Sequence, residues 1–476
     1  MAMITMIKKR DGRQVPFNIE KIANAIFKAA QTVGGNDYKE AMDLADKVCQ
    51  ELSEEVIGRD PSVEEVQDMV ERVLVEQGHT KTAKAYILYR ADRTRAREMN
   101  STLMKIYEDL TFMSASDCDI KRENANIDGD TAMGTMLKYG SEGAKQFNEM
   151  YVLDPKHSRA HINGDIHIHD LDFLTLTTTC CQIDLLKLFH GGFSTGHGYL
   201  REPNDISSYA ALACIAIQSN QNDQHGGQSV PIFDYAMAEG VKKTFRRLYT
   251  NNLAKAVSFT LGIEDYNEVL EEFKLIASEI GKEYGLYPSL QNNDEYKAKE
   301  WEIASAKYGD EFSHLQDRAE KLAESETDRA TYQAMEALIH NLNTMNSRAG
   351  AQNPFSSINY GTDTSPEGRM VIKNVMLAEE HGLGNGETPI FPIHIFKVKE
   401  GVNYNPGDPN YDLFKLAIRV SAKRMFPNFS FIDAPFNLQY YKPGDYHTEA
   451  AYMGCRTRVI GNVYDPTREI VTGRGN

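Results

Sequence analysis

YMGCRTR, at residues 452–458, is the stretch of this 476-residue sequence that does most to decide its fold and its chemistry. Gly454 lets the backbone turn tightly just before Cys455, and Arg456 and Arg458 place cations beside the thiol, which favours the thiolate form. A thiolate nucleophile and a cysteine beside a phosphate both fit this pattern. The stretch by itself leaves both alternatives open, so the surrounding sequence has to decide.

Length and composition set outer limits on the fold. A chain of 476 residues is too long for one ordinary core, so we expect two or more units, with room for a barrel of several hundred residues. Hydrophobic residues make up 41% and charged residues 25%, as in soluble globular proteins. Residues 1–13 lack the apolar core of a secretory signal, and the longest nearly uncharged apolar run, 209–217, is far shorter than the roughly 18 residues that span a bilayer. We therefore expect a cytoplasmic protein without a membrane segment.

Charge and cysteine content exclude further classes. The net charge is −16, from 52 basic and 68 acidic residues, so we expect no nucleic-acid partner, although local basic sites for nucleotides stay open. The six cysteines form no Cys-x-x-Cys pair, which supports neither a disulfide framework nor a zinc ribbon. Any special cysteine is therefore expected to be chemical. The cysteines are Cys49, Cys118, Cys180, Cys181, Cys214 and Cys455.

The first 95 residues predict a small helical unit behind a β-hairpin. Asp11-Gly12 is a favoured two-residue turn at the centre of residues 4–15. Apolar residues then recur at helical spacing from 19 to 30, behind an Asn18 N-cap. Three later helices are marked by residues 41–52, by a Ser62/Glu65 capping box ahead of residues 66–73, and by residues 80 to about 97.

Positive charge gathers around this hairpin. Lys9, Arg10 and Lys21 lie beside a helix start, whose free N–H groups suit phosphate. A solvated basic turn is the more common meaning of such a short cluster, so charge alone does not establish nucleotide binding.

Beyond residue 95 the sequence changes to longer apolar strands, glycine-bounded loops and helices, which indicates an α/β body. Residues 163–185 alternate and are rich in β-branched types, so we expect a strand, a turn and a second strand there. Residues 262–345 differ, because they are rich in Glu, Lys and Ala with few glycines. We expect solvated or peripheral helices in that segment.

His167 and His169 would share one face of the first of these strands, close to Asp165 and Asp170. Imidazole and carboxylate are good metal ligands. No third ligand is fixed by spacing, however, and strand histidines are often satisfied by hydrogen bonds. We therefore predict no metal site here.

Cys180 and Cys181 are adjacent within the second of these strands. Successive side chains of a strand point to opposite faces, so only one of the two thiols can face an interior site. Free cysteines are commonly small core residues, and the dipeptide alone does not favour a chemical role.

Residues 3 to about 95 resemble an ATP-cone, the helical module that distinguishes ATP from dATP. The resemblance lies in KRDG, in the PF and KI that follow, and in the closing AKAYILYR. Such cones also occur in a transcriptional repressor and in other reductase classes, so the module indicates regulation and not a reaction. The resemblance implies that the residues contacting nucleotide are Lys9, Arg10, Asn18 and Lys21, with Arg90 a further candidate.

The rest of the chain resembles the anaerobic, class III ribonucleotide reductases. YMGCRTR is similar to their finger loop, whose tip cysteine forms a thiyl radical and takes the 3′ hydrogen of the ribose, which implies that role for Cys455. CCQID is similar to the strand with their reducing cysteine, a Cys followed three residues later by Ile and then an acidic residue, which selects Cys180. Asn476 falls where the family has an active-site amide that hydrogen-bonds the ribose. Further similar segments follow the family order: RENANIDGDTAMG, QHGGQSVPIFDY, SRAGAQNPFSSINYGTD, ETPIFPIHIFKVKEGVN and GRGN.

This resemblance implies an α/β fold in which a small helical ATP-cone, residues 1–95, precedes an incomplete ten-stranded α/β barrel of the glycyl-radical type, residues 96–476. The finger loop lies near 452–458. The implied activity is the anaerobic reduction of ribonucleoside triphosphates to deoxyribonucleoside triphosphates, controlled by ATP and dATP with Mg²⁺.

Family members continue for some hundreds of residues to a structural zinc site with four cysteines and a loop that bears the glycyl radical. We expect both groups only outside this chain, and no turnover by the chain alone. Formate is the expected reductant, because no second redox cysteine is evident beside the site. The expected partners are the substrates, the nucleotide effectors, a radical-SAM activating enzyme, and further copies in a homodimer or higher homo-oligomer.

Two other classes remain as alternatives. Another glycyl-radical enzyme, such as a formate lyase or a diol dehydratase, would share the barrel but would have no use for an ATP/dATP switch. A nucleotide-sensing regulator would use the cone alone, with the remaining residues as scaffold.

Overall fold

The computed structural model describes residues 4–10, 12–114, 116–118, 128–174, 178–309, 311–439, 441–455 and 457–459. The chain divides into two units, residues 1–112 with 142–172, and residues 113–141 with 173–476. Each unit encloses an apolar core of its own.

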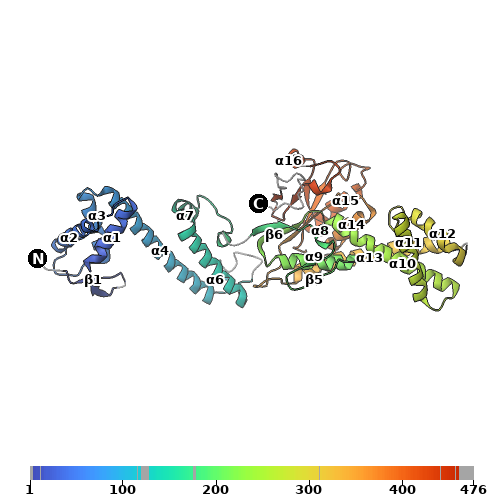
Figure 1. The fold of residues 1–476 in the computed structure, drawn as a ribbon, viewed down its shortest axis with the longest axis horizontal. Helices are drawn as coiled ribbons and strands as arrows, with labels where there is room; N and C mark the ends of the chain where they lie inside the picture. The colour runs from blue at the N-terminus through green and yellow to red at the C-terminus, as the bar shows by residue number, and fades with distance from the viewer. Residues whose placement is uncertain are drawn as a thin grey trace. The chain divides into compact units, whose positions relative to one another are not determined.

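The first unit begins with the predicted hairpin and helices (Figure 1). β1 (Met6–Lys8) pairs antiparallel with β2 (Gln14–Pro16). Asn18 caps α1 (Ile19–Thr32), and Ser62 and Glu65 form a reciprocal capping box at α3 (Val63–Glu76). These helices share one core with α2 (Tyr38–Glu55) and the start of α4 (Thr80–Phe112). The prediction that the fourth helix ends near residue 97 is wrong, because no glycine or proline interrupts residues 80–112.

Residues 163–185 contain one strand where the alternation predicts two. The described residues 163–174 form turns and a 3₁₀ helix, η2 (Leu171–Phe173), whereas the second predicted strand is β3 (Thr178–Gln182). Gly164 at φ +80° and Asp170 at φ +50° turn the backbone out of the extended conformation, which explains the missing strand. The remaining elements of the two units are α6 (Ala132–Phe147), the π-helix η1 (Asn148–Val152), α7 (Pro155–Ile162), α8 (Leu185–Phe189), β4 (Phe193–Ser194), β5 (Tyr199–Leu200), α16 (Pro435–Leu438) and η3 (Tyr446–Thr448).

The second unit is built on a parallel five-stranded sheet, which confirms the predicted α/β body. Its order is β3, β6 (Gln224–Val230), β7 (Ser356–Tyr360), β8 (Ile393–Val398) and β9 (Asn428–Phe431), so each strand pairs with the next one along the chain. Five strands of the predicted incomplete ten-stranded barrel are present among the described residues. The crossovers contain α9 (Ile206–Asn220), α10 (Phe233–Leu261), α13 (Phe312–Thr344), α14 (Pro366–His381) and α15 (Tyr411–Arg424).

The two faces of this sheet differ in chemistry because side chains alternate along each strand. One face is apolar and shares its core with α9, α10, α13, α14 and α15; it contributes Val230, Ile358, Tyr360, Phe396 and Val398. The other face, called the polar face, is almost fully buried; it contributes Ser229, Ser357, Asn359 and Lys397, and the alternation along β8 adds the apolar Ile393 and Ile395. Residues 449–453 lie on the polar face and hydrogen-bond to it. The sheet is thus covered on both sides, as parallel sheets usually are.

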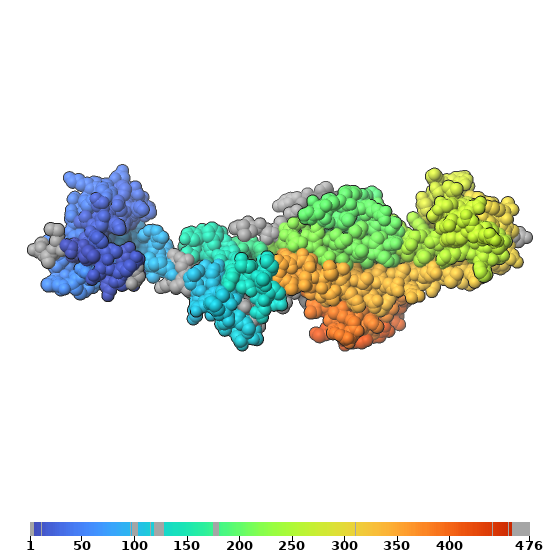
Figure 2. Space-filling model, turned by 90° about the horizontal axis from the view of Figure 1, so that it is seen from below, coloured from blue at the N-terminus to red at the C-terminus, as the bar shows by residue number. Residues whose placement is uncertain are grey.

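A helical lobe, residues 245–323, has a second core at the far ends of α10 and α13. α11 (Tyr266–Tyr284) and α12 (Asn293–Tyr308) pack there against the two long helices, and Figure 2 shows the lobe as a yellow-green mass beyond the sheet. The prediction of peripheral helices for residues 262–345 is wrong for the second half of α13, where Met335, Leu338 and Leu342 belong to the main core, and is confirmed in position for α11 and α12. Their packing is tighter than expected of solvated helices, since Tyr249, Phe273 and Phe312 have no exposed surface.

One carboxyl group lies inside the core of the helical lobe. Glu300 is 1% exposed and accepts hydrogen bonds from Tyr249 Oη at 2.7 Å, Tyr296 Oη at 3.1 Å and Gln316 Nε2 at 2.8 Å. Burial raises the pKa of Glu300 to about 7, because the three donors offset only part of the desolvation.

Replacing Glu300 by Gln should therefore remove a pH dependence of stability. With a folded pKa above the unfolded value, the contribution of Glu300 is full below the unfolded pKa and is lost as the pH rises through about 7. Between roughly pH 5 and pH 8, we expect the free energy of unfolding of the wild type to fall by up to about 3 kcal/mol more than that of the variant, in which other buried carboxyl groups still titrate. Urea unfolding can be followed through Trp301 in α12, the single tryptophan of the chain. If the free energy of unfolding changes equally with pH in both proteins, the raised pKa of Glu300 is contradicted.

Candidate active site

The stretch YMGCRTR forms a short hairpin with Cys455 in its turn. In this finger hairpin, residues 451–459, β10 (Ala451–Tyr452) pairs antiparallel with β11 (Arg458–Val459). Cys455 is exposed, with its Sγ 3.2 Å from Thr457 Oγ1. A Cβ added at Gly454 would stand 2.7 Å from Ile393 Cδ1 of β8, so the hairpin lies directly against the sheet. Arg456 lies outside the described residues.

Cys180 occupies an irregular point of β3. The register between β3 and β6 shifts at this residue, and its φ of +43° is rare for a residue with a side chain. Its Sγ accepts a hydrogen bond from Gly227 N–H at 3.3 Å and packs with Ala451 and Met453. The bulge therefore turns the Cys180 thiol toward the base of the finger hairpin.

Cys181 contacts a different element. Asn220 Nδ2, at the end of α9, donates to Cys181 Sγ at 2.8 Å and to Gln228 Oε1 at 2.7 Å. The two neighbouring thiols thus point apart, as the alternation along a strand predicts. Of the pair, Cys180 meets the segment that carries Cys455.

A buried ion pair holds the chain that leads into the finger hairpin. Lys397 Nζ of β8 lies 3.1 Å from Glu449 Oε2, and Thr362 Oγ1 donates to the same oxygen at 2.7 Å. Both charged side chains are at most 5% exposed. Because an unpaired buried charge is strongly destabilising, Glu449 cannot leave the sheet without a penalty at Lys397.

Asp234, in the first turn of α10, fixes the loop after β7. It has no exposed surface, and its Oδ2 accepts the main-chain N–H groups of Gly361, Thr362 and Asp363 at 2.8, 3.1 and 3.1 Å. Burial raises the pKa of Asp234, although Lys397 and the main-chain donors oppose this shift. The loop that supplies Thr362 to Glu449 is therefore held by a second buried carboxyl group.

In the N-terminal unit, the two predicted arginines contact the acidic face of α3. Arg10 forms an ion pair with Glu64. Arg90 Nη1 lies 2.5 Å from Asp68 Oδ1 and 2.8 Å from Glu71 Oε1. Both guanidinium groups thus carry acidic partners that a nucleotide phosphate would have to displace.

The other predicted nucleotide contacts lie close by in sequence. Asn18 Oδ1 accepts the N–H of Glu20 at 2.8 Å as the cap of α1. Lys9 and Lys21 are exposed on the hairpin and on the first turn of α1. Arg10 is exposed as well, but it is paired with Glu64.

A basic groove of about 550 Å³ runs along α10 beside residues 202–204, and sequence reasoning missed it. Lys243, Arg246, Arg247 and Lys274 line it. The guanidinium of Arg246 lies 4.4 Å from the ring centroid of Tyr287, and its Nε is buried without a hydrogen-bond partner among the described residues. The signal was present in KKTFRR at 242–247, because cations three and four residues apart share one helix face.

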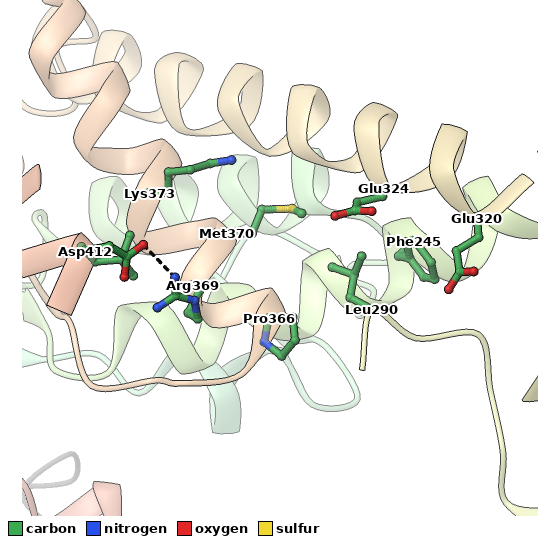
Figure 3. Close-up of a pocket in the computed structure, with 10 residues that line it drawn as sticks. Phe245, Leu290, Glu320, Glu324, Pro366, Arg369, Met370, Lys373 and Asp412 are labelled. Atoms are coloured by element: carbon green, nitrogen blue, oxygen red, sulfur yellow. Dashed lines mark hydrogen bonds and ion pairs between the residues drawn. The ribbon is translucent and has the colours of Figure 1, made fainter. Parts of the chain in front are cut away.

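A second cavity, of about 290 Å³, carries charges of both signs (Figure 3). Glu320 and Glu324 come from α13, and Arg369 and Lys373 come from α14, with Met370 between them. Asp412 Oδ2 lies 2.8 Å from Arg369 Nη2. No cysteine lines this cavity or the basic groove, so both are distinct from the finger hairpin site.

The predicted histidines lie on a turn instead of a strand. The rings of His161, His167 and His169 follow one another at centroid distances of 5.7 Å. Within the described ranges, no group of three His, Cys, Asp or Glu side chains could hold a metal ion. Among the helices that the structure describes, none is long and apolar enough to cross a membrane. Asn476, the predicted ribose-binding amide, lies outside the described residues.

Comparison with protein families assigns both parts of the chain. A model described as ATP cone domain matches residues 5–95, and one described as anaerobic ribonucleoside-triphosphate reductase matches residues 123–476. These matches define the class of chain in which an ATP-cone domain precedes a reductase body. The chain belongs to the anaerobic ribonucleoside-triphosphate reductase family.

Individual relatives agree with this assignment. The anaerobic ribonucleoside-triphosphate reductase of Escherichia coli (strain K12) is 28% identical over 478 residues, which cover 100% of this chain and 57% of the relative. The enzyme of the same name from Enterobacteria phage T4 is 28% identical over 75% of this chain and 49% of its own length. The chain therefore spans little more than half the length of these relatives. A solved Thermotoga maritima anaerobic ribonucleotide reductase, in complex with dATP and CTP, aligns with a TM-score of 0.39 at 14% identity, covering 71% of this chain and 50% of that one.

Thiol labelling tests the placement of the cysteines. Cys455 is exposed, whereas Cys214 is buried in α9, where burial raises the pKa of its thiol to about 12. Because the thiolate is the reactive form, iodoacetamide at about pH 8 should modify Cys455 at least ~10-fold faster than Cys214. Peptide mass mapping over time measures both rates, and Cys455→Ser should remove the fast phase. Equal rates in the folded protein would contradict the described site.

Proposed function

We propose that this chain provides the regulatory module and a large part of the catalytic body of an enzyme that reduces ribonucleoside triphosphates to deoxyribonucleoside triphosphates without oxygen. The observation that carries the proposal is the packing of the Cys180 thiol against Ala451 and Met453, at the base of the hairpin that presents Cys455. Two cysteine segments from distant parts of the sequence thus share the polar face of one sheet. Ribose reduction needs this arrangement, because separate groups act at C3′ and C2′.

In the proposed reaction, Cys455 as a thiyl radical takes the 3′ hydrogen atom of the ribose. The 2′ hydroxyl then leaves as water with the proton of the 3′ hydroxyl, and Cys180 donates a hydrogen atom at C2′, which leaves a 3′ ketone on the sugar and a thiyl radical on Cys180. A glycyl radical outside these residues supplies the oxidising equivalent for Cys455. Formate supplies the two electrons of the net reaction: its hydrogen atom restores the Cys180 thiol, and its remaining electron, with a proton from solvent, reduces the 3′ ketone to a C3′ radical as carbon dioxide leaves. Cys455 then returns its hydrogen atom to C3′, and its thiyl radical forms again. Asn476 orients the ribose through its amide.

The buried polar face supports this chemistry in two ways. The chain before the finger hairpin is fixed by the contacts among Lys397, Glu449 and Thr362. These contacts limit the range of positions that the reacting thiol can take. The burial of these side chains also keeps water from the chain that leads into the finger hairpin, whereas Cys455 at its tip is exposed among the described residues.

The remaining parts of the proposal concern the whole enzyme. We place the boundary between cone and catalytic body at residue 95, and we place the structural zinc and the glycyl radical outside the 476 residues. A radical-SAM enzyme would install that radical, and Mg²⁺ would accompany the bound nucleotides. We expect a homodimer or higher homo-oligomer in the cytoplasm.

Regulation follows from the cone. ATP and dATP would bind through Lys9, Arg10, Asn18, Lys21 and Arg90. A triphosphate would displace Glu64 from Arg10 and Asp68 from Arg90, which offers a way to link nucleotide binding to the packing of α3. Control further requires that ATP and dATP stabilise different states of the enzyme.

The basic groove along α10 supports a second nucleotide site, in the body. Its volume of about 550 Å³ is large enough for a nucleotide, and four cations line it, of which Lys243 is paired with Glu202 and Arg247 with Asp205. The guanidinium of Arg246, which lies over the ring of Tyr287, is the charge that would bind a phosphate. This groove favours the reductase over a regulator that uses the cone alone. The cone disfavours other glycyl-radical enzymes, which need no ATP/dATP switch.

Replacing Cys455 by Ala in the complete, activated enzyme should abolish deoxyribonucleotide formation, because no other group could take the 3′ hydrogen. Nucleotide binding should remain, since neither the cone nor the basic groove includes Cys455. Product analysis and calorimetry measure the two properties. Cys49→Ala, in the cone, is the matched control and should keep the activity. Substantial reduction by the Cys455→Ala enzyme would end this assignment.

Calorimetric titration with ATP and dATP should resolve two kinds of site. Lys9→Ala with Lys21→Ala should remove the binding to the cone, whereas Arg246→Ala should weaken the body site by roughly tenfold or more, the effect of one lost charged hydrogen bond. Lys255→Ala, on the same helix but outside the groove, controls for general charge effects. If the variant with both Lys9→Ala and Lys21→Ala binds no nucleotide at all, the result favours a regulator that uses the cone alone.

A further inference from the structure

A side-chain amide holds the main chain at the base of the finger hairpin. Asn359 Oδ1 accepts the N–H of Tyr452 at 2.9 Å, and Asn359 Nδ2 donates to the carbonyl oxygen of Tyr452 at 3.0 Å. Ser229 Oγ donates to the same carbonyl at 3.0 Å, and Asn359 Nδ2 lies 2.9 Å from Ser229 Oγ. Asn359 has no exposed surface and Ser229 is 1% exposed.

The hydrogen bonds between Asn359 and Tyr452 take the place of the main-chain hydrogen bonds that a neighbouring strand would make. Among the strands that the structure describes, β10 pairs with β11 alone, so within these residues the main chain of Tyr452 would lack partners on the side that faces the sheet without Asn359 and Ser229. The amide of Asn359 offers one donor and one acceptor in the same spacing as a peptide group, and it projects from the polar face of β7. The finger hairpin is thereby joined to the sheet by two side chains instead of a further ladder.

The contact is placed where it can set the position of Cys455. Tyr452 is the last residue of β10, and Met453 N–H already belongs to the turn, donating to Thr457 O at 2.9 Å. Met453 also packs with Cys180. A shift of Tyr452 relative to β7 would therefore move the whole turn, and the Cys455 thiol with it, relative to Cys180.

We propose that Asn359, assisted by Ser229, is a positioning residue that sets the location of the Cys455 thiol over the polar face of the sheet. We name the contact of Asn359 and Ser229 with the main chain of Tyr452 the clamp. The effect of the clamp on ribose reduction rests on the proposed function, whereas the contact itself does not. The requirement is for an amide. An aspartate would turn an acceptor oxygen, in place of the Nδ2 donor, toward the Tyr452 carbonyl. Alanine would leave the Tyr452 N–H without its sheet-side partner and its C=O with Ser229 Oγ alone.

The test compares Asn359→Ala and Asn359→Asp with Asn374→Ala. Asn374 is an equally buried asparagine of the same unit, 2% exposed, whose Nδ2 donates to Asp328 Oδ1 and Met370 O, both away from the finger hairpin. Hydrogen exchange of peptides that cover residues 446–455 should be at least ~10-fold faster in both Asn359 variants and unchanged in Asn374→Ala. Faster exchange at Tyr452 in all three variants, or in none, would overturn the proposal.

In the complete, activated enzyme, Asn359→Ala should lower kcat by roughly 100-fold and leave KM for the ribonucleoside triphosphate nearly unchanged, because the thiol is misplaced and the nucleotide contacts remain. Equal kcat losses in Asn359→Ala and Asn374→Ala would show a merely structural role and overturn the proposal. If the wild type reduces no ribonucleotide, the proposed function fails, while the exchange measurement still decides on the clamp.

A milder pair of variants covers the case in which Asn359→Ala does not fold. Ser229→Ala removes one donor to the Tyr452 carbonyl, and Ser357→Ala removes a similarly buried hydroxyl that donates to Gln228 O. Exchange at residues 446–455 should rise several-fold in Ser229→Ala only. An unchanged rate in Ser229→Ala would contradict the clamp.

Discussion

The alternation of side chains along β6, β7 and β8 is the constraint on which the second unit depends. One set of residues, which includes Ile358 and Phe396, is apolar and lies under the helices. The other set, which includes Asn359 and Lys397, is polar and has no exposed surface. Burying such groups is unfavourable unless each one finds a partner. Their partners lie in residues 449–452, so the polar face requires the segment that carries Cys455 to lie where it does.

On the same face of the sheet, the backbone is strained at Cys180. Cys180 adopts a positive φ at a break in the β3–β6 register, a conformation that costs roughly 1–3 kcal/mol for such a residue. The hydrogen bond from Gly227 and the packing against Met453 offset part of this energy. Strain of this kind is typical of sites where a side chain must point in one direction, and here it points the thiol at the finger hairpin.

How much the sequence predicts depends on the range of the interactions. The β1–β2 hairpin, the Asn18 cap and the Ser62/Glu65 box could be predicted because their bonds join residues close together in the chain. Residues 165–169 alternate like a strand but do not form one, since backbone turns on either side override the pattern. The role of Asn359 could not be seen, because its partner lies 93 residues away and a buried asparagine has no local signature. The same holds for Arg246, whose unsatisfied Nε depends on the packing of the helical lobe.

In the proposed function, a ribonucleotide reacts at the polar face of the sheet, where Cys180 packs against the finger hairpin. An experimental structure of the complete enzyme with a bound ribonucleoside triphosphate tests this claim most directly. We predict the ribose over the polar face, with Cys455 Sγ near C3′ and Cys180 Sγ near C2′, each within about 3.5 Å as reacting atoms require. A ribose bound elsewhere, or one with the two thiols on separate sides of the sheet, would contradict this claim.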